Sequence, residues 1–371
     1  MSNLPIESDV IIVGAGFAGL NLAHALSKNN IKTIIIDRQT KCPDIFRAEK
    51  IEPDQAEIMK EIGTLTFRQP KEHKVGTILT YDGELKTNID TIEQYGISYA
   101  DTVNSLRENL PKSIQLINER VIEISSFSNY KSVSCSNNIT VNAPLVVLST
   151  GGNNNLLKSL NIQRKYENEL RSFSFGFDVS LDRNKIKNGF NYFLPSNSNI
   201  DYVTIFPIGE RMRVNLFTRF NPKDTKIKEF KVDPILAMTK YFKGIEELTG
   251  KIALCSKVQS VPTTFYRLRN FLQSGLVVIG DEFQSVSPAT GSGLSKVLVD
   301  VKVLSQTYIP RWLKDKTFGK NDIKKFYKDP LKIKADSKSM EYWISYHTKS
   351  LNNKVPFINK IKYTMMIKGL L

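Results

Sequence analysis

The chain has 371 residues, of which 41% are hydrophobic and 24% charged, so it is long and apolar enough to bury a globular core, which excludes the disordered, collagen-like and coiled-coil classes. Its formal net charge of +15 comes without zinc-finger spacing or an aromatic-basic RNA motif, so we expect no nucleic-acid partner and attribute the charge to a lysine-rich composition. Attraction to anionic ligands or membrane surfaces is the alternative explanation.

The first predicted elements are a buried strand, a glycine-rich turn, a helix and a second buried strand. Residues 9–13 end in a continuous run of β-branched side chains, and residues 20–28 have a helical composition. Residues 32–36 form a second apolar run, which ends at Asp37. This order is typical of the opening of a dinucleotide-binding unit.

Three glycines are spaced as Gly-x-Gly-x-x-Gly in that turn. Gly14 permits a tight turn out of the strand, Gly16 lets backbone N–H groups approach a pyrophosphate at the helix N-terminus, and Gly19 lets the helix pack closely on the strand. An acidic residue about 20 positions further on, here Asp37, accepts hydrogen bonds from a ribose diol. The alternative is a glycine-rich turn without a ligand. The predicted cofactor contacts in this unit are Gly14, Gly16, Phe17, Ala18, Gly19, Asp37 and Arg38.

The middle of the chain carries weaker signals. We expect a helix at 101–110 and a strand at 120–124, on which Val121 would pack near the adenine. A further apolar strand at 143–148 leads into a Ser-Thr-Gly-Gly sequence that contains Gly151. These elements fit the same nucleotide-binding unit.

A second glycine-rich motif lies near the other end of the chain. An apolar strand at 276–279 runs into Gly-Asp-Glu-Phe and then into a Pro-x-x-Gly-x-Gly turn, which is followed by a helix that carries Asp300. The strand-end Asp281 can bond a ribityl hydroxyl, and the turn offers backbone N–H donors to a pyrophosphate or an anionic flavin ring. The predicted cofactor contacts in this turn are Pro288, Gly291, Gly293 and Leu294.

Together the two motifs resemble those of the para-hydroxybenzoate hydroxylase superfamily, the class A flavoprotein monooxygenases with their geranylgeranyl reductase and halogenase relatives. The late motif of that family reads Gly-Asp-Ala-x-His, and Glu282 and Gln284 stand here in place of its small residue and its histidine. An arginine after the second strand contacts the FAD phosphates in that family, and Arg47 matches it. The alternatives are that Arg47 is a surface arginine or that Lys50 takes this role. Thr150 replaces the aspartate of an Asp-Gly pair that serves both FAD and the nicotinamide cofactor, while Gly151 is kept.

The resemblance implies an α/β fold, in which a Rossmann-type FAD-binding domain carries an inserted β-rich substrate domain and a C-terminal helical segment. The expected boundaries are 1–72, 92–170 and 260–310 for the FAD-binding domain, 73–91 and 171–259 for the substrate-binding domain, and 311–371 for the helical segment.

The inserted region is expected to supply the substrate pocket. Residues 173–179 and 212–220 predict strands, and 202–207 resemble the segment that lines the cavity beside the flavin in geranylgeranyl reductases and some halogenases. For Phe206, cavity lining and plain sheet core are equal alternatives, and a stripe of sheet aromatics is more often core. The predicted substrate pocket comprises Phe175, Tyr202, Phe206, Pro207 and Phe217.

The resemblance implies an FAD-dependent monooxygenase that hydroxylates a small organic substrate, apolar or aromatic, with O₂ through a flavin C4a-hydroperoxide. NADPH or NADH would reduce the flavin, and the altered Thr150 segment makes a separate flavin reductase the alternative electron source. The alternative functions are an FAD-dependent reductase or dehydrogenase of an isoprenoid-like substrate and a non-enzymatic FAD-binding protein. A halogenase is disfavoured because the Trp-x-Trp-x-Ile-Pro segment of that group is absent. No catalytic base is predicted, since His73 and His347 fit a surface or core position better.

The remaining features bear on location. Three scattered cysteines fit a reducing compartment and indicate neither disulfides nor a metal site. With no signal peptide and no apolar run long enough to span a membrane, we expect a cytoplasmic protein. Residues 352–371 mix apolar and lysine side chains, so they would either contact an anionic membrane or dock on the chain's own core or on a partner subunit.

Overall fold

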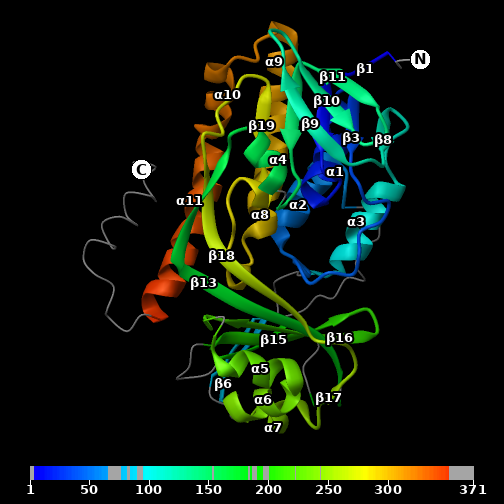
Figure 1. Ribbon diagram of the computed structural model, residues 1–371. Coiled ribbons are helices and arrows are strands. Elements are labelled where there is room, and N and C mark those ends of the chain that lie inside the picture. The colour runs from blue at the N-terminus through cyan, green and yellow to red at the C-terminus, as the bar shows by residue number, and fades with distance from the viewer. Residues whose placement is uncertain are drawn as a thin grey trace.

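The computed structural model is shown in Figure 1, where a helix-covered upper part lies above a second, lower sheet. The structure describes residues 4–65, 77–81, 84–89, 95–152, 154–182, 184–185, 190–194, 200–221, 223–242 and 244–350. His73, the side chain of His347 and the predicted tail at 352–371 lie outside the described residues.

The upper part is built on a five-stranded parallel sheet. Its strands lie in the order β19 (Leu276–Val278), β12 (Leu145–Leu148), β2 (Val10–Val13), β3 (Thr33–Ile36) and β8 (Ile114–Ile117). Every residue of β2, β3 and β12 is buried, as expected for strands that are covered on both faces. Because all five strands are parallel, their carboxyl ends meet at one edge, where Gly14, Asp37, Ser149 and Gly280 come close together.

Helices cover one face of this sheet and a small sheet covers the other. The helices on the first face are α1 (Phe17–Lys28), α2 (Pro53–Ile62), α3 (Tyr99–Glu108) and α8 (Gly293–Val303). The small sheet has the order β1 (Ile6–Glu7), β11 (Thr140–Ala143), β10 (Lys131–Cys135) and β9 (Val121–Ser126), and α4 (Asn154–Ser159) lies beside it. Alternate residues of β2 divide between the two cores, with Val10 and Ile12 against the helices and Ile11 and Val13 against the small sheet.

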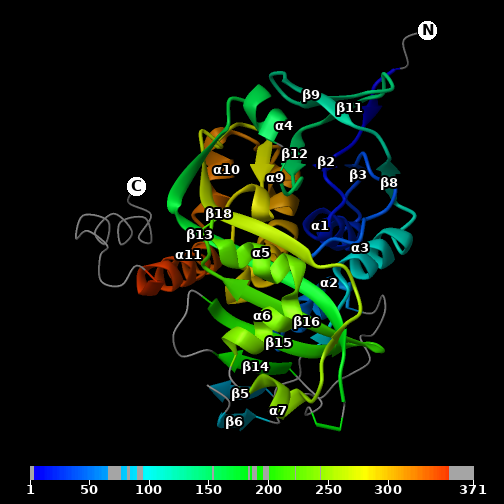
Figure 2. The same ribbon diagram turned by 60° about the horizontal axis from the view of Figure 1, so that its bottom comes forward.

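The lower part is an eight-stranded sheet with three helices on one face (Figure 2). Its strands are β6 (Glu84–Ile89), β5 (Thr77–Tyr81), β14 (Phe190–Leu194), β15 (Ile200–Ile208), β16 (Arg211–Thr218), β13 (Gln163–Ser180), β17 (Ala253–Leu254) and β18 (Gln259–Arg269), the last two both paired with β13. The helices are α5 (Thr225–Val232), α6 (Pro234–Tyr241) and α7 (Ile245–Thr249). The long strands β13 and β18 extend from this sheet to the upper part, and so connect the two parts (Figure 1).

Two further groups of elements complete the described chain. A short ribbon pairs β4 (Lys50–Ile51) with β7 (Tyr95–Gly96). After α8 the chain continues through η3 (Leu304–Tyr308), α9 (Ile309–Asp315), α10 (Lys320–Tyr327) and α11 (Pro330–Ser350), of which α11 packs against α8. Within the described part of the chain, none of the helices combines the length and apolar character that crossing a membrane requires.

The predicted α/β fold is confirmed, with its parallel sheet, covering helices and β-rich second part. The strand predicted at 173–179 is wrong in extent, because β13 begins at Gln163 and is 18 residues long. Its pairing with β18 shifts register between Glu167 and Arg171. Such an irregularity interrupts the alternation of apolar and polar residues, so only the second half of β13 shows a strand pattern in the sequence.

Candidate functional site

A cavity of about 1040 Å³ lies between the carboxyl edge of the parallel sheet and the lower sheet. Gly14, Asp37 and Gly280 line it on the upper side, and side chains of β15 and β16 line it on the lower side. A second cavity of about 560 Å³ adjoins it at Gly14 and Asp37 and reaches β9 at Val121. Cavities at the carboxyl ends of parallel strands are where open α/β sheets bind their dinucleotides.

The glycine turn between β2 and α1 leaves room for a ligand. Gly14 has a φ of +107°, and a Cβ there would lie 2.7 Å from the Ser149 carbonyl oxygen. A Cβ on Gly19 would collide with the Gly14 carbonyl oxygen, so this glycine lets α1 lie against the turn. Beside Gly16, by contrast, a Cβ would approach the described residues only at the Tyr99 hydroxyl, 3.8 Å away. Because the N-cap residue of α1 is Gly16, which has no side chain to cap the helix, the first N–H groups of α1 are left for an anionic ligand.

Asp37, at the end of β3, holds its carboxylate against this turn. Its Oδ2 accepts a hydrogen bond from the Ala15 N–H at 2.6 Å, and its Oδ1 accepts one from the Gln39 N–H at 2.8 Å. Arg107 of α3 donates to the carbonyl oxygens of Ala15, at 3.1 Å, and of Gln39. These bonds hold the carboxylate where the two cavities meet, which suits a contact with a ribose.

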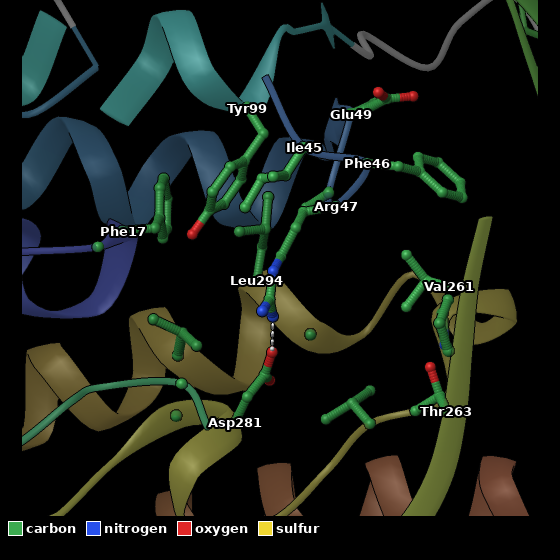
Figure 3. Close-up of a pocket in the computed structure, with 18 of the residues that line it drawn as sticks. Phe17, Ile45, Phe46, Arg47, Glu49, Tyr99, Val261, Thr263, Asp281 and Leu294 are labelled. Atoms are coloured by element: carbon green, nitrogen blue, oxygen red, sulfur yellow. Dashed lines mark hydrogen bonds and ion pairs between the residues drawn. The ribbon is translucent and has the colours of Figure 1, made fainter. Parts of the chain in front are cut away.

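Arg47 and Asp281 meet across the main cavity. The Arg47 Nη1 donates to the Asp281 Oδ2 at 3.2 Å, and Figure 3 shows the two side chains reaching toward each other from different segments. The Arg47 side chain is 43% exposed and that of Asp281 is 40% exposed. Exposed ion pairs contribute only about 0.2–1 kcal/mol, so both groups can readily exchange this contact for a ligand.

The loop before α8 forms another wall of the main cavity. The short turn η2 (Pro288–Thr290) ends at Gly291, whose φ is +63°, and α8 begins at Gly293, which lines the cavity. The Tyr202 hydroxyl donates to the Ala289 carbonyl oxygen at 2.5 Å and so ties this loop to the lower sheet. The N-terminus of α8, with its positive dipole end, therefore opens into the cavity.

A buried ion network holds the end of β19. Asp300 accepts the Gly280 N–H at 3.0 Å, and Lys296 donates to the Gly280 carbonyl oxygen at 3.1 Å. Lys332 of α11 lies 2.7 Å from Asp300 and 3.2 Å from Asp336. Burial would raise the pKa of Asp300, but the ammonium groups of Lys296 and Lys332 hold that pKa below its ordinary value. The network thereby ties the strand end at the cavity to α8 and α11.

Glu282, which follows Asp281 in the chain, is fully buried. Its Oε2 accepts hydrogen bonds from the Thr150 hydroxyl and the Gly152 N–H, both at 2.6 Å. Its Oε1 pairs with Arg164 at 3.0 Å. Glu282 stands where the resembled family has a small side chain, and its carboxylate holds the loop after β12.

The lower sheet turns one face to the cavity and the other to α5, α6 and α7. On β16, Val214 belongs to the core with the helices, whereas Asn215 and Phe217 line the cavity. The neighbouring strand β15 divides in the same way. Its residues Thr204 and Tyr202 lie opposite Asn215 and Phe217, and Thr204 and Tyr202 also line the cavity. The cavity face therefore combines aromatic and polar side chains.

A buried charged cluster lies on this same face. Arg213 donates from Nε to Glu49 at 2.8 Å, from Nη1 to Asp178 at 3.2 Å and from Nη2 to Gln259 at 2.8 Å. Burial raises the pKa of Glu49 above its ordinary value, and the positive charge of Arg213 opposes that shift. A Cβ on Gly176 would lie 2.6 Å from the Arg213 Nη2, so the absence of a side chain there makes room for the guanidinium.

Most of the predicted cofactor residues line the two cavities. Those on the main cavity are Gly14, Gly16, Phe17, Ala18, Asp37, Arg47, Gly151, Asp281, Pro288, Gly291, Gly293 and Leu294. Arg38 and Val121 line the second cavity, while Gly19 packs against the turn. The structure thus brings together residues from both glycine-rich motifs.

The predicted substrate residues divide between the two faces of the lower sheet. Tyr202, Phe206 and Phe217 line the main cavity. Phe175 instead lies in the core beneath the helices, with its ring centroid 5.5 Å from that of Phe230. Pro207 also does not line the cavity.

Sequence reasoning missed Tyr99, Arg107, Glu49, Arg213 and Asn215, all of which line the main cavity or contact residues that do. One signal was available for the last two residues, because polar side chains that alternate with apolar ones along a strand indicate a face that is not plain core. Tyr99, Arg107 and Glu49 carry no local pattern, and only tertiary contacts bring them to the site.

Comparison with protein families gives a match to a model described as an FAD binding domain, over residues 7–307. Among curated proteins, the chain is 26% identical over 355 residues to a squalene monooxygenase of Brassica napus, covering 86% of this chain and 67% of that protein. It is 23% identical over 319 residues to the squalene monooxygenase of Mus musculus, covering 81% of this chain and 54% of that protein. The chain thus spans only about half to two thirds of the length of these relatives.

Solved structures of several flavoproteins share the fold. A flavin-dependent brominase superimposes with a TM-score of 0.74 at 15% sequence identity, covering 97% of this chain and 93% of the other. A p-nitrophenol 4-monooxygenase from Pseudomonas putida superimposes with a TM-score of 0.73 at 14% identity, covering 98% of this chain and 94% of the other.

Proposed function

This chain belongs to the FAD binding domain family of the class A flavoprotein monooxygenases and is an FAD-dependent oxidoreductase, and from this premise we propose that it hydroxylates a small organic substrate held between the flavin and the lower sheet. The observation that carries the proposal is that the main cavity runs without interruption from the glycine turn at Gly16 to the aromatic side chain of Phe217. A cofactor at one end and a substrate at the other would meet beside the N-terminus of α8.

The residues around the cavity fit FAD. The open space at Gly16 and the uncapped start of α1 suit a diphosphate, Asp37 suits a ribose diol, and Asp281 suits a ribityl hydroxyl. Arg47 has a partly exposed guanidinium in the cavity, which suits a phosphate oxygen. When bound, FAD would supply the redox chemistry that activates O₂. The chain's own residues bind it, orient it and keep water from the substrate.

The substrate end supports an apolar or aromatic molecule. Phe46, Phe206, Phe217 and Val261 line it, and aromatic side chains of this kind bind flat or apolar ligands. Figure 3 shows Phe46 and Val261 on the same side of the cavity, away from Arg47 and Asp281. No side chain here is needed as a nucleophile, because the cofactor supplies the reactive group.

A second candidate function is an FAD-dependent reductase or dehydrogenase of an isoprenoid-like substrate. The resemblance of residues 202–207 to geranylgeranyl reductases favours it, and Tyr202, Thr204 and Phe206 of that segment line the cavity. The similarity to squalene monooxygenases also favours an isoprenoid-like substrate, although those proteins are named for oxygenation rather than reduction.

We also propose NADPH or NADH as the electron donor. A separate flavin reductase is the alternative, since Thr150 stands at the position of the family's aspartate and is engaged with Glu282. We further propose a cytoplasmic location and peripheral membrane contact through residues 352–371. We also propose that the chain divides into FAD-binding, substrate-binding and C-terminal segments.

The test is anaerobic reduction of the purified, FAD-loaded protein by NADPH or NADH, followed by admission of air, with the flavin spectrum recorded throughout. Fast bleaching and recovery in air, together with substrate-dependent O₂ uptake and an oxygenated product, support the monooxygenase. Reduction of an isoprenoid probe without O₂ uptake favours the second candidate. If the flavin stays bound but neither NADPH nor NADH bleaches it, a separate reductase is indicated.

A further inference from the structure

Arg107 and Asp37 hold the backbone of the same two residues. The Asp37 carboxylate accepts the N–H groups of Ala15, at 2.6 Å, and of Gln39, at 2.8 Å. The Arg107 guanidinium donates to the carbonyl oxygens of these two residues, from its Nη2 to Ala15 at 3.1 Å and from its Nη1 to Gln39. Ala15 belongs to the glycine turn and Gln39 to the segment after β3, so the two charged side chains join the turn to that segment.

The segment after β3 depends on such contacts because it has no regular structure. Residues 37–49, which connect β3 to β4, form neither a helix nor a strand. Asn104 of α3 holds both backbone groups of Cys42, since its Oδ1 accepts the N–H at 2.8 Å and its Nδ2 donates to the carbonyl oxygen at 3.2 Å. Together with Arg107, α3 therefore fixes the start of this segment at two points, Gln39 and Cys42. Side-chain bonds of this kind offset the entropy that an ordered loop loses.

The helix that carries Arg107 is itself fixed to α1. The buried His24 of α1 donates from its Nε2 to the Leu106 carbonyl oxygen at 2.9 Å, one residue before Arg107. At the other end of the helix, Tyr99 reaches from α3 toward Phe17 at the start of α1 (Figure 3). Tyr99 and Arg107 both line the main cavity. A helix held at both ends gives the guanidinium a rigid base at the cofactor site.

The direction of the Asp37 carboxylate depends on this arrangement. Each of its oxygens accepts one backbone N–H, and a carboxylate oxygen can accept a further hydrogen bond, so both can still bond a ribose hydroxyl. A binding group acts well only when its neighbours hold it within roughly 0.5 Å of the productive position. Without Arg107 the carbonyl groups of Ala15 and Gln39 would lose their shared donor, and the two backbone segments that orient the carboxylate would separate.

We propose that Arg107 is a positioning residue for FAD that acts through Asp37. By holding Ala15 and Gln39 together it directs the carboxylate toward the ribose diol, and so gives the site its preference for a cofactor with an intact adenosine ribose. The inference rests on the proposed placement of FAD and assigns part of the cofactor's selection to α3. Lysine cannot replace the arginine, because only the planar guanidinium fork donates to two carbonyl oxygens in fixed directions.

The experiment titrates the deflavinated protein with FAD and with an FAD analogue whose adenosine ribose lacks the 2′-hydroxyl, and follows the flavin absorbance. We expect the parent to bind FAD about tenfold more tightly than the analogue, as for a hydroxyl bonded to a carboxylate. Asp37→Ala should abolish this preference. Arg107→Met and Arg107→Lys should each weaken FAD binding about tenfold and reduce the preference to less than about threefold. Asn104→Leu should change both quantities in the same direction by a smaller factor.

Asn109→Leu is the matched control for Asn104→Leu. Asn109 is the C-cap residue of the same helix, its side chain donates to the Ser105 carbonyl oxygen at 2.8 Å, and it lines neither cavity. Its substitution should leave the preference for FAD over the analogue unchanged. Denaturant unfolding of the apoproteins shows which variants are folded. Because Arg107→Lys keeps the charge and most of the side chain, the test holds even if Arg107→Met fails to fold.

Two results would overturn the inference. Arg107 variants that keep the parent's preference would show that Asp37 needs no help from α3. Variants that bind FAD and the analogue with equally reduced affinity relative to the parent, and so also keep the preference, would show that Arg107 stabilises the fold or acts on the diphosphate as a charge.

A parent protein that binds the two cofactors equally well would overturn both the inference and the placement of the ribose at Asp37. Bleaching by NADPH or NADH and substrate-dependent O₂ uptake, recorded on the same samples, test the proposed function separately. A monooxygenase in which Asp37→Ala loses the preference and the Arg107 variants keep it would retain the proposed function and exclude the role of Arg107.

Discussion

Arg47 and Asp281 lie 234 residues apart in the sequence, yet the Arg47 guanidinium donates to the Asp281 carboxylate at 3.2 Å across the main cavity. The Arg47 side chain is 43% exposed and that of Asp281 is 40% exposed, so water weakens the contact and the two groups exchange it easily. One partner belongs to the segment expected to contact the FAD phosphates and the other to the strand end expected to contact the ribityl chain. The contact brings the two groups together in the cavity, where a bound dinucleotide would separate them and lie between them.

Arg47→Met should weaken FAD binding with little effect on stability. Methionine keeps the length of the side chain but removes a charge-assisted contact to phosphate, so we expect the dissociation constant to rise roughly ten- to a hundredfold. Titration of the deflavinated protein with FAD measures it. Arg211→Met is the control, since Arg211 also pairs with a carboxylate, at 3.1 Å, but lines neither cavity. Equal losses in the two variants would contradict the role of Arg47.

Substitutions at Gly14 and Gly16 should separate folding from cofactor binding. Gly14→Ala forces a side chain into a left-handed backbone and against the Ser149 carbonyl oxygen, so we expect a loss of about 1–3 kcal/mol of unfolding free energy. Gly16→Val meets open space, so the apoprotein should unfold near the parent's midpoint but retain no FAD. Denaturant unfolding and the flavin absorbance of the purified variants measure the two effects. A yellow Gly16→Val protein would show that the diphosphate lies elsewhere.

The local part of the site was predictable from the sequence, because its residues are adjacent to the strands that position them. Asp37 and Asp281 follow buried β-branched runs, and Gly14 and Gly16 lie in one short turn. The chemistry of such a unit depends on spacing along the chain, which a sequence displays directly. The predicted fold class follows from the same strands and is confirmed by the parallel sheet.

Contacts between distant segments were not predictable. Nothing in the sequence connects Thr150 with Glu282, and yet their side chains are 2.6 Å apart. The alternation on β16 was visible, but which of its faces meets the cavity depends on where α5, α6 and α7 pack. That is why Phe175 was expected in the pocket and lies in the core. The domain boundaries remain a prediction, because β13 and β18 belong to both parts.

Lys332→Met should be strongly destabilising. The substitution leaves Asp300 and Asp336 with Lys296 as their nearby ammonium group, so a buried carboxylate loses its partner at a cost of about 3–5 kcal/mol. Chemical unfolding followed by circular dichroism measures the loss. Lys334→Met, an exposed position on the same helix, should change stability by less than about 0.5 kcal/mol. A small loss in Lys332→Met would mean that the network is not structural.

The same network predicts how stability depends on pH. The folded-state pKa of Asp300 lies below its ordinary value of 3.8, so the folded protein binds fewer protons at this group than the unfolded chain does. Its stabilising contribution is therefore complete above about pH 4 and is lost as the pH falls through the folded-state value. Unfolding free energies measured between neutral and acidic pH should fall less steeply in Asp300→Asn than in the parent. Parallel curves would exclude Asp300 as a source of the acid dependence.

Thr150 and Glu282 should be coupled in a way that single substitutions reveal. Thr150→Asp places a second carboxylate against the buried Glu282, where Arg164 is the charged partner at 3.0 Å, so we expect a loss of about 1–3 kcal/mol and poorer retention of FAD. Thr150→Ser keeps the hydroxyl that donates to Glu282 and should behave like the parent. Unfolding and flavin content measure all the variants.

The double variant Thr150→Asp/Glu282→Ala restores the residue types found in the resembled family, an aspartate after β12 and a small residue after Asp281. In the double variant one carboxylate again faces Arg164. Its loss of unfolding free energy should therefore be smaller than the sum of the two single losses by at least about 1 kcal/mol. Strict additivity would mean that the two residues do not replace each other. A positive coupling would show that a carboxylate on either loop can serve as the partner of Arg164.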